Sequence, residues 1–253
     1  GSAIFSISGI TILSEGPAAI LSWVAGGIIM GLYGLQVAEL SVHYKESGGL
    51  FIYPFKAINK TCGFFCAWGG VIVNTITISF SAIFIGKYFI NFLGFSEIAS
   101  YGIDVLAILL VCLAGFKKLD STSKINNVLG ISAIVLFVLL AIGGVVFCDF
   151  QIQNFNNFFE GTHGQTGWIQ AIPNAMLAYG GVSTVAFLVG EIKNPSSTVP
   201  KSLAIGLCLT IFFYLLVIVV IIGNIPMDAF KSDENALLTP LLYIFRLDSG
   251  STI

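Results

Sequence analysis

The sequence predicts an all-α helix bundle embedded in a membrane. Charged residues make up only 9% of the 253 residues, whereas a typical soluble domain has about a quarter. Hydrophobic residues reach 56% and the mean hydropathy is +0.95, which is more apolar surface than one soluble core can cover. Long apolar runs without alternation of period two favour helices over the strands of a membrane barrel.

Six apolar runs are long enough to cross about 30 Å of hydrocarbon as helices of about 20 residues. In chain order they are Gly16–Leu40, Gly63–Leu93, Glu97–Phe116, Ile125–Phe147, Trp168–Val189 and Ser202–Ile225. A half-length run, Gly1–Leu13, precedes them, and an unfinished run, Leu237–Leu247, follows. We therefore expect one transmembrane domain over residues 1–253, truncated at both ends, in a multi-pass protein of the plasma membrane.

The lysines predict the orientation, because cytoplasmic loops carry an excess of Lys and Arg. One set of alternate connections contains Lys45, Lys56, Lys60, Lys117, Lys118, Lys124, Lys193 and Lys201. The other set has only Lys87, at a helix end, and Lys231. The first set is therefore expected inside the cell, and Asp149–Gly167, which has no Lys or Arg, outside. Within the first set, Leu50–Lys60 fits either an amphipathic helix at the membrane interface or a solvated loop.

Composition and residue spacing exclude several classes of function. Eleven Lys and Arg residues, spread along a chain of net charge −2, give no basic face for nucleic acid. The five cysteines lie in or beside apolar runs and form no CxxC pair, so we interpret them as buried hydrophobic residues. No catalytic triad or metal-ligand spacing occurs at membrane depth, and we predict a non-enzyme that needs no cofactor and no metal.

Two glycine-containing segments predict breaks in membrane helices. They are Gly1–Phe5 (GSAIF) in the first half-length run and Ala178–Ser183 (AYGGVS) in the fifth full run. Lipid cannot satisfy the N–H and C=O groups that a break frees, so a break persists only where it lines a cavity. The alternative is that small residues only allow close helix packing, as expected for Gly26-Gly27 and Gly143-Gly144. Two matched breaks favour a binding site.

The segment GSAIF resembles the GSGIF motif in the first transmembrane helix of the amino acid-polyamine-organocation (APC) superfamily. Residues 15–19 (EGPAA) and 38–40 (AEL) resemble its second helix, and residues 190–201 (GEIKNPSSTVPK) resemble the loop after its sixth helix. This resemblance covers most of the chain. It implies a LeuT-like bundle of two inverted five-helix repeats, present here from half of helix one to the start of helix eight.

The resemblance also implies a secondary transporter that moves amino acids by alternating access. In this superfamily the backbone of the first motif binds the substrate carboxylate, and helix six helps to hold its amine. The implied substrate-binding residues are Gly1, Ser2, Ala3, Ile4, Ala178, Tyr179, Gly181 and Val182. Helix dipoles agree with this assignment, because a break at Gly1 exposes a positive helix end and the carbonyls before Gly180 form a negative one.

Departures from the superfamily pattern bear on the substrate and its coupling. Val182 replaces an aromatic residue and Ser183 replaces an acid on helix six, so the site suits a neutral amino acid better than a cationic one. Ala133, or Ser132 if the alignment shifts by one residue, stands where some proton-coupled relatives carry a Lys on helix five. We therefore expect exchange or passive carriage, or an ion site completed by helix eight, and the coupling ion stays unidentified.

Two other classes stay open as alternatives. A seven-helix receptor has a similar number of spans, although its retinal-binding form needs a buried Lys late in the chain, and the last two spans have none. A membrane subunit without transport activity is the second, but it has no use for two helix breaks at one depth. An ion channel is less suitable, because the sequence has neither a TVGYG-type filter nor a ring of acids.

Overall fold

The computed structural model describes residues 3–44, 46, 48–93, 96–116, 119–146 and 150–232. Within these ranges the chain is helical and has no strand, which confirms the all-α prediction. The α-helices are α1 (Ala3–Glu15), α2 (Ala19–His43), α3 (Ile52–Ala57), α4 (Lys60–Leu93), α5 (Glu97–Gly115), α6 (Leu119–Val146), α7 (Gly167–Ala178), α8 (Pro195–Asn224) and α9 (Met227–Ser232). The 3-10 helices are η1 (Gly16–Ala18), η2 (Gly49–Phe51), η3 (Ile152–Phe155), η4 (Gly164–Thr166), η5 (Gly180–Phe187) and η6 (Val189–Glu191).

Four helical segments of the described chain are long and apolar enough to cross a membrane. They are Ile7–His43, Lys60–Lys87, Lys124–Val146 and Pro195–Asn224. The other two predicted spans differ from this pattern: α5 has a shorter apolar stretch, Ile98–Leu113, and the fifth run is divided between α7 and η5. These lengths and compositions identify an integral membrane protein.

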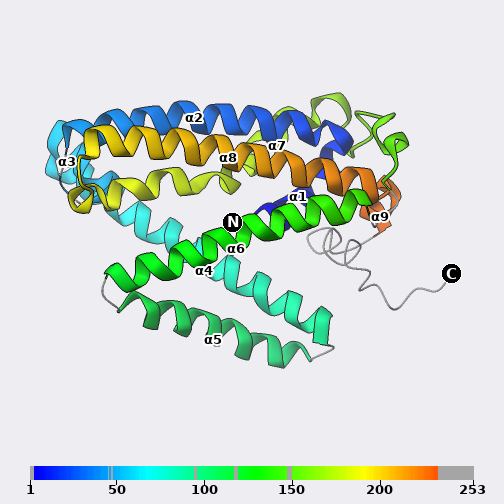
Figure 1. The fold of residues 1–253 in the computed structure, drawn as a ribbon, viewed down its shortest axis with the longest axis horizontal. Coiled ribbons are helices and arrows are strands. Elements are labelled where there is room, and N and C mark those ends of the chain that lie inside the picture. Colours follow the sequence, from blue (N-terminus) through cyan, green and yellow to red (C-terminus); the bar gives the residue numbers. More distant parts are fainter. Residues whose placement is uncertain are drawn as a thin grey trace.

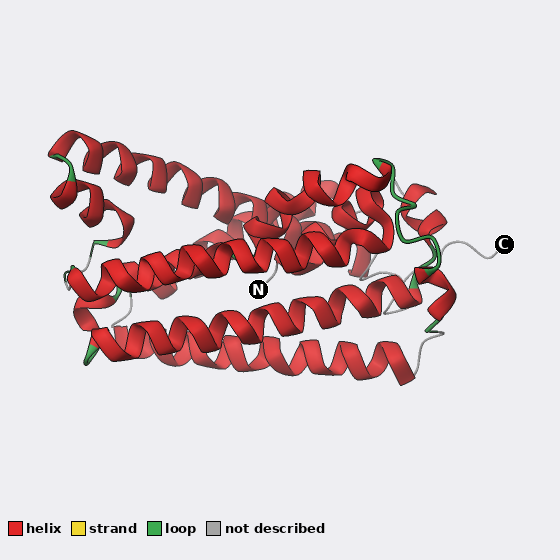
Figure 2. Cartoon of the chain, turned by 90° about the horizontal axis from the view of Figure 1, so that it is seen from above, coloured by secondary structure: helices red, strands yellow, loops and turns green. Residues whose placement is uncertain are grey.

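The elements run largely along one long axis, and α2 packs lengthwise against α7 and α8 (Figure 1). Helix α6 also packs on α8, whereas α4 and α5 form a hairpin on the side of the molecule away from α2 (Figure 1). Figure 2 shows the same chain from above, with helices joined by loops. Many large apolar side chains of this hairpin are exposed, for example Val73 at 62% and Leu110 at 59%. Such faces suit lipid or further helices as neighbours.

Several helices begin before the apolar runs that predicted them, and α8 shows this most clearly. The last full span was predicted to begin at Ser202, but α8 begins earlier, at Pro195. Proline is tolerated in the first turn because its missing N–H would have no helical partner there, so the helix begins at Pro195, before the apolar run. The segment Leu50–Lys60, for which a helix and a loop were both open, contains the short helix α3.

The chain turns sharply between α1 and α2, at a segment that we name the α1–α2 corner (Leu13–Ala18). Gly16 adopts φ = +68° at this turn, a conformation that residues with a side chain rarely adopt. The loop 157–163 covers the corner and is held by three backbone hydrogen bonds. Their donor and acceptor pairs are Ala18 N to Phe158 O (2.9 Å), Thr162 N to Leu13 O (3.2 Å) and His163 N to Ser14 O (3.0 Å).

Candidate functional site

Two short helices, α1 and α7, show where along the helix axes the candidate site lies. We call this position the level of the site. They pack against each other, and Gly167 at the start of α7 lies beside Ser14 near the end of α1. The two helices are therefore antiparallel. Because α1 has 13 residues and α7 has 12, each is about 18–20 Å long. The N-terminal end of α1 consequently lies near the level of the C-terminal end of α7.

Helix α7 breaks where the glycine pair predicted it. The α-helix ends at Ala178 and the chain continues from Gly180 as the 3-10 helix η5. In a continuing α-helix the Ala178 carbonyl would accept the N–H of Val182, but that N–H donates to Tyr179 O instead (3.3 Å). The predicted break is confirmed, and it removes the α-helical partner of the Ala178 carbonyl.

Two tyrosine hydroxyls fix the broken segment to its neighbours. Tyr214 on α8 donates to the Ala178 carbonyl (3.2 Å), and Tyr179 donates to the Trp23 carbonyl on α2 (3.2 Å). The ring centroids of Tyr179 and Tyr214 are 5.2 Å apart, and those of Trp23 and Tyr214 are 5.5 Å apart. Ala178 and Tyr179 are thus buried and hydrogen-bonded at the break, whereas Gly180 and Gly181, which follow them, are exposed.

The structure brings together four of the eight predicted site residues. Ile4, Ala178, Tyr179 and Val182 are buried and belong to one hydrophobic cluster with Trp23 and Tyr214. Gly181 is exposed and Ala3 begins α1, whereas Gly1 and Ser2 lie outside the described residues. The assignment of all eight residues to substrate binding stays a prediction.

The side chain of Tyr179 packs in the hydrophobic cluster, so the accessible atoms at the break are main-chain atoms of Gly180 and Gly181. Tyr179 is only 2% exposed, whereas a Cβ placed on Gly180 or Gly181 would have no described atom within 4 Å. The hydroxyls of Ser183 and Thr184 donate to the carbonyls of these two glycines, at 3.3 and 2.6 Å. Space beside two glycines allows a ligand to approach the main chain closely.

The electrostatics of this level come from helix ends rather than from charged side chains. Helix α7 presents its negative C-terminal end there, and the break predicted at Gly1, which lies outside the described residues, would add a positive helix end. The stretch from Gly167 to Phe187 contains no Asp, Glu, Lys, Arg or His. Within the described residues, moreover, no group of three His, Cys, Asp or Glu side chains could hold a metal ion. The arrangement suits a small zwitterion whose carboxylate and amine meet opposite helix ends.

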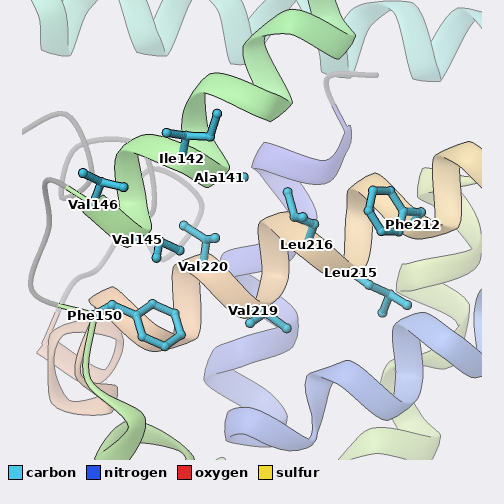
Figure 3. Close-up of a pocket in the computed structure, with 10 residues that line it drawn as sticks. All are labelled: Ala141, Ile142, Val145, Val146, Phe150, Phe212, Leu215, Leu216, Val219 and Val220. Carbon is cyan, nitrogen blue, oxygen red and sulfur yellow. The ribbon is translucent and has the colours of Figure 1, made fainter.

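A cavity of about 590 Å³ lies elsewhere, between α6 and α8 (Figure 3). Its lining is entirely aliphatic and aromatic and includes Val145, Phe150, Phe212 and Val220. None of the predicted site residues that the structure describes lines it. The described lining has no polar side chain to orient a carboxylate or an amine, so it is less suited to an amino acid than the break is.

Sequence reasoning missed the residues that hold the break. Trp23 and Tyr214 lie inside apolar runs and were counted there only as hydrophobic residues. Each carries a polar atom, and a buried polar atom needs a hydrogen-bond partner. This need was the sequence feature that could have indicated a structural role for the two residues. In the structure the indole N–H of Trp23 donates to Thr11 Oγ1 at 3.1 Å, and Tyr214 bonds to Ala178.

The sequence is similar to known proteins along most of its length. Residues 1–247 match the family described as amino acid permease. The aspartate-proton symporter of Bacillus subtilis (strain 168) is 27% identical over 91% of this chain and 46% of its own length. The serine/threonine exchanger SteT of the same organism is 24% identical, over 100% and 58%. The b(0,+)-type amino acid transporter 1 of Mus musculus is 29% identical, over 80% and 43%. The chain spans about half the length of the curated relatives that it matches.

Proposed function

The chain belongs to the amino acid permease family of the APC superfamily, and we propose that the full-length protein is a secondary transporter that carries amino acids across the plasma membrane by alternating access. The observation that carries this proposal is the break after α7, which lies at the level of Ala3 on the antiparallel helix α1. We place a second break at Gly1, where it would expose a positive helix end. A positive and a negative helix end at the same level match the two charges shared by all amino acids.

The proposed substrates have neutral side chains. A cationic side chain at membrane depth needs a buried acid, and an anionic one needs a basic partner. No acid occurs between Gly167 and Phe187, and no Lys or Arg occurs between Ile125 and Ile192. Val182 and Ser183 replace the aromatic residue and the acid of the superfamily pattern, which supports the same conclusion.

Exchange or passive carriage is the proposed mode of transport. Ala133 lies on α6 at the position where some proton-coupled relatives carry a Lys, and alanine has no group to titrate. One of the relatives is named a serine/threonine exchanger and another an aspartate-proton symporter, so the relatives include both modes. All three relatives named above are transporters, which supports the prediction of a non-enzyme.

Counterflow in proteoliposomes tests the proposal. Vesicles that contain the purified full-length protein are loaded with an unlabelled neutral amino acid and diluted into a trace of the same labelled compound, without an ion gradient. We expect transient accumulation of label that a proton uncoupler does not change. Absence of counterflow for every neutral amino acid tried would refute the function, and accumulation only under an imposed proton gradient would refute the exchange mode.

A pair of glycine variants tests the site. Gly181 and Gly206 both have open space at the Cβ position, but only Gly181 lies in the break, whereas Gly206 lies within α8. Gly181→Leu should fill the space beside the break and remove substrate binding, while Gly206→Leu should bind as the unchanged protein does. Melting temperatures of both variants show whether they fold. Equal substrate affinity in the two folded variants would exclude the break as the binding site.

A further inference from the structure

A single carboxyl group is fully buried at the α1–α2 corner. Glu15 is the last residue of α1, and its side chain is 0% exposed. The oxygen Oε2 lies 2.6 Å from Ser22 Oγ on α2. The other oxygen, Oε1, is buried and has no hydrogen-bond partner within the described part of the chain. A buried carboxylate with a free oxygen is costly unless it is paired or takes up a proton.

The two contacts of the Ser22 hydroxyl indicate whether the Glu15 carboxyl is protonated. Ser22 Oγ lies 2.6 Å from Glu15 Oε2 and also 2.8 Å from the carbonyl oxygen of Ala19. A serine hydroxyl has one proton, and a carbonyl has none to give. If Ser22 donates to Ala19, the contact with Glu15 needs a proton on Oε2. A protonated carboxyl group therefore satisfies both contacts at once, whereas a carboxylate satisfies only one.

Few other titratable groups lie on the elements around the corner. The covering loop carries Glu160 and His163, α9 carries Asp228 and Lys231, and α7 carries none. Glu160, His163 and Asp228 are exposed. Within the described residues, the only hydrogen bond of the Glu15 carboxyl is the one to Ser22.

We propose that Glu15 is a proton-binding site of the transporter, loaded while the loop 157–163 covers the α1–α2 corner. When the loop lifts, water reaches the carboxyl; the acid O–H bond breaks and its proton passes to that water, and the reverse step reloads it. The loop is held by three backbone hydrogen bonds, and the same corner joins the ends of α1 and α7 that lie away from the break. Protonation of Glu15 therefore controls whether the loop 157–163 closes over the α1–α2 corner. The lysine pattern assigns this corner to the outside of the cell. This consequence rests on the proposed function.

The first test measures counterflow while the external pH is varied from about pH 5 to about pH 9. Buried carboxyl groups and histidines in proteins titrate in this range. The unchanged protein should exchange fastest in acid and slow as the pH rises, by up to about tenfold per pH unit beyond the midpoint. Glu15→Gln should be active and insensitive to pH, because glutamine is neutral and its amide donates to Ser22. His163→Gln and Glu160→Gln should keep the pH dependence of the unchanged protein.

The second test does not depend on transport. Infrared difference spectra of the purified full-length protein should contain the C=O band of a protonated carboxylic acid that Glu15→Gln removes and Glu160→Gln retains. If Glu15→Gln loses that band but neither the unchanged protein nor its variants show counterflow, the proton site is supported and the proposed function is refuted. An unchanged band in Glu15→Gln would overturn the proton site, as would a pH dependence that Glu15→Gln keeps and His163→Gln abolishes.

Discussion

The hydroxyl of Tyr214 should stabilise the protein because it supplies a donor that the helix break has taken away. The Ala178 carbonyl lost its α-helical partner when the Val182 N–H turned to Tyr179, and the Tyr214 hydroxyl lies 3.2 Å from it. Tyr214→Phe removes this donor and keeps the aromatic ring. The phenylalanine ring keeps the packing with Trp23, because the two ring centroids lie 5.5 Å apart and the hydroxyl is not part of that contact.

The expected loss follows from burial. Tyr214 is 2% exposed, so water cannot replace the missing donor at the Ala178 carbonyl. A buried acceptor left without a partner costs about 1–3 kcal/mol, which is about 5- to 150-fold in the folding equilibrium. Tyr179→Phe should cost less, about 0.5–1.5 kcal/mol, because its acceptor, the Trp23 carbonyl, lies inside α2 and retains a helical partner.

Thermal unfolding of the purified full-length protein in detergent measures the difference. Tyr101→Phe is the matched control, since Tyr101 is 69% exposed and the same hydroxyl is removed there from the surface of α5. The order of stability loss should be Tyr214→Phe, then Tyr179→Phe, then Tyr101→Phe, with the control close to the unchanged protein. If Tyr214→Phe melts at the same temperature as the control, the Ala178 carbonyl does not depend on this hydroxyl and the reasoning is wrong.

Two further predictions concern the α4–α5 hairpin and the topology. Gly86→Val should destabilise the protein by about 1–3 kcal/mol, because a Cβ at Gly86 would collide with the buried carboxylate of Asp104, whereas Gly69→Val meets open space and serves as the control in the same unfolding assay. In intact cells, an impermeant thiol reagent should label a cysteine placed at Asn157 and spare one at Ser121; the opposite pattern would invert the topology taken from the lysines.

The features that the sequence predicted well are local in origin. Apolar runs of about 20 residues depend only on composition, and four of them are long membrane-length helices in the structure. The break beside Gly180 was indicated by two consecutive glycines, which weaken a helix. A glycine pair alone does not specify a break, because Gly26-Gly27 and Gly143-Gly144 lie inside the unbroken helices α2 and α6. The exact end of α7 at Ala178 was not, since the apolar run continues to Val189 without a change in composition.

Features that depend on distant contacts could not be predicted in this way. Glu15 stands next to Gly16 and Pro17, a pattern typical of an exposed turn, yet the loop near Phe158 covers it. At Gly161 a Cβ would overlap the backbone of Ser14 and Glu15, so the cover fits only with glycine at that position. The contact joins segments more than 140 residues apart, and neither segment by itself indicates it.

Tyr179 shows why a correct break did not give a correct picture of the side chains around it. Helical periodicity relates the directions of neighbouring side chains only while the α-helix continues, and it stops at Ala178. Beyond that point the tyrosine packs between α2 and α8, and Gly180 and Gly181 keep the open space. We infer that the substrate meets main-chain groups at the break, so the two glycines limit its size and the tyrosine holds the backbone that binds it.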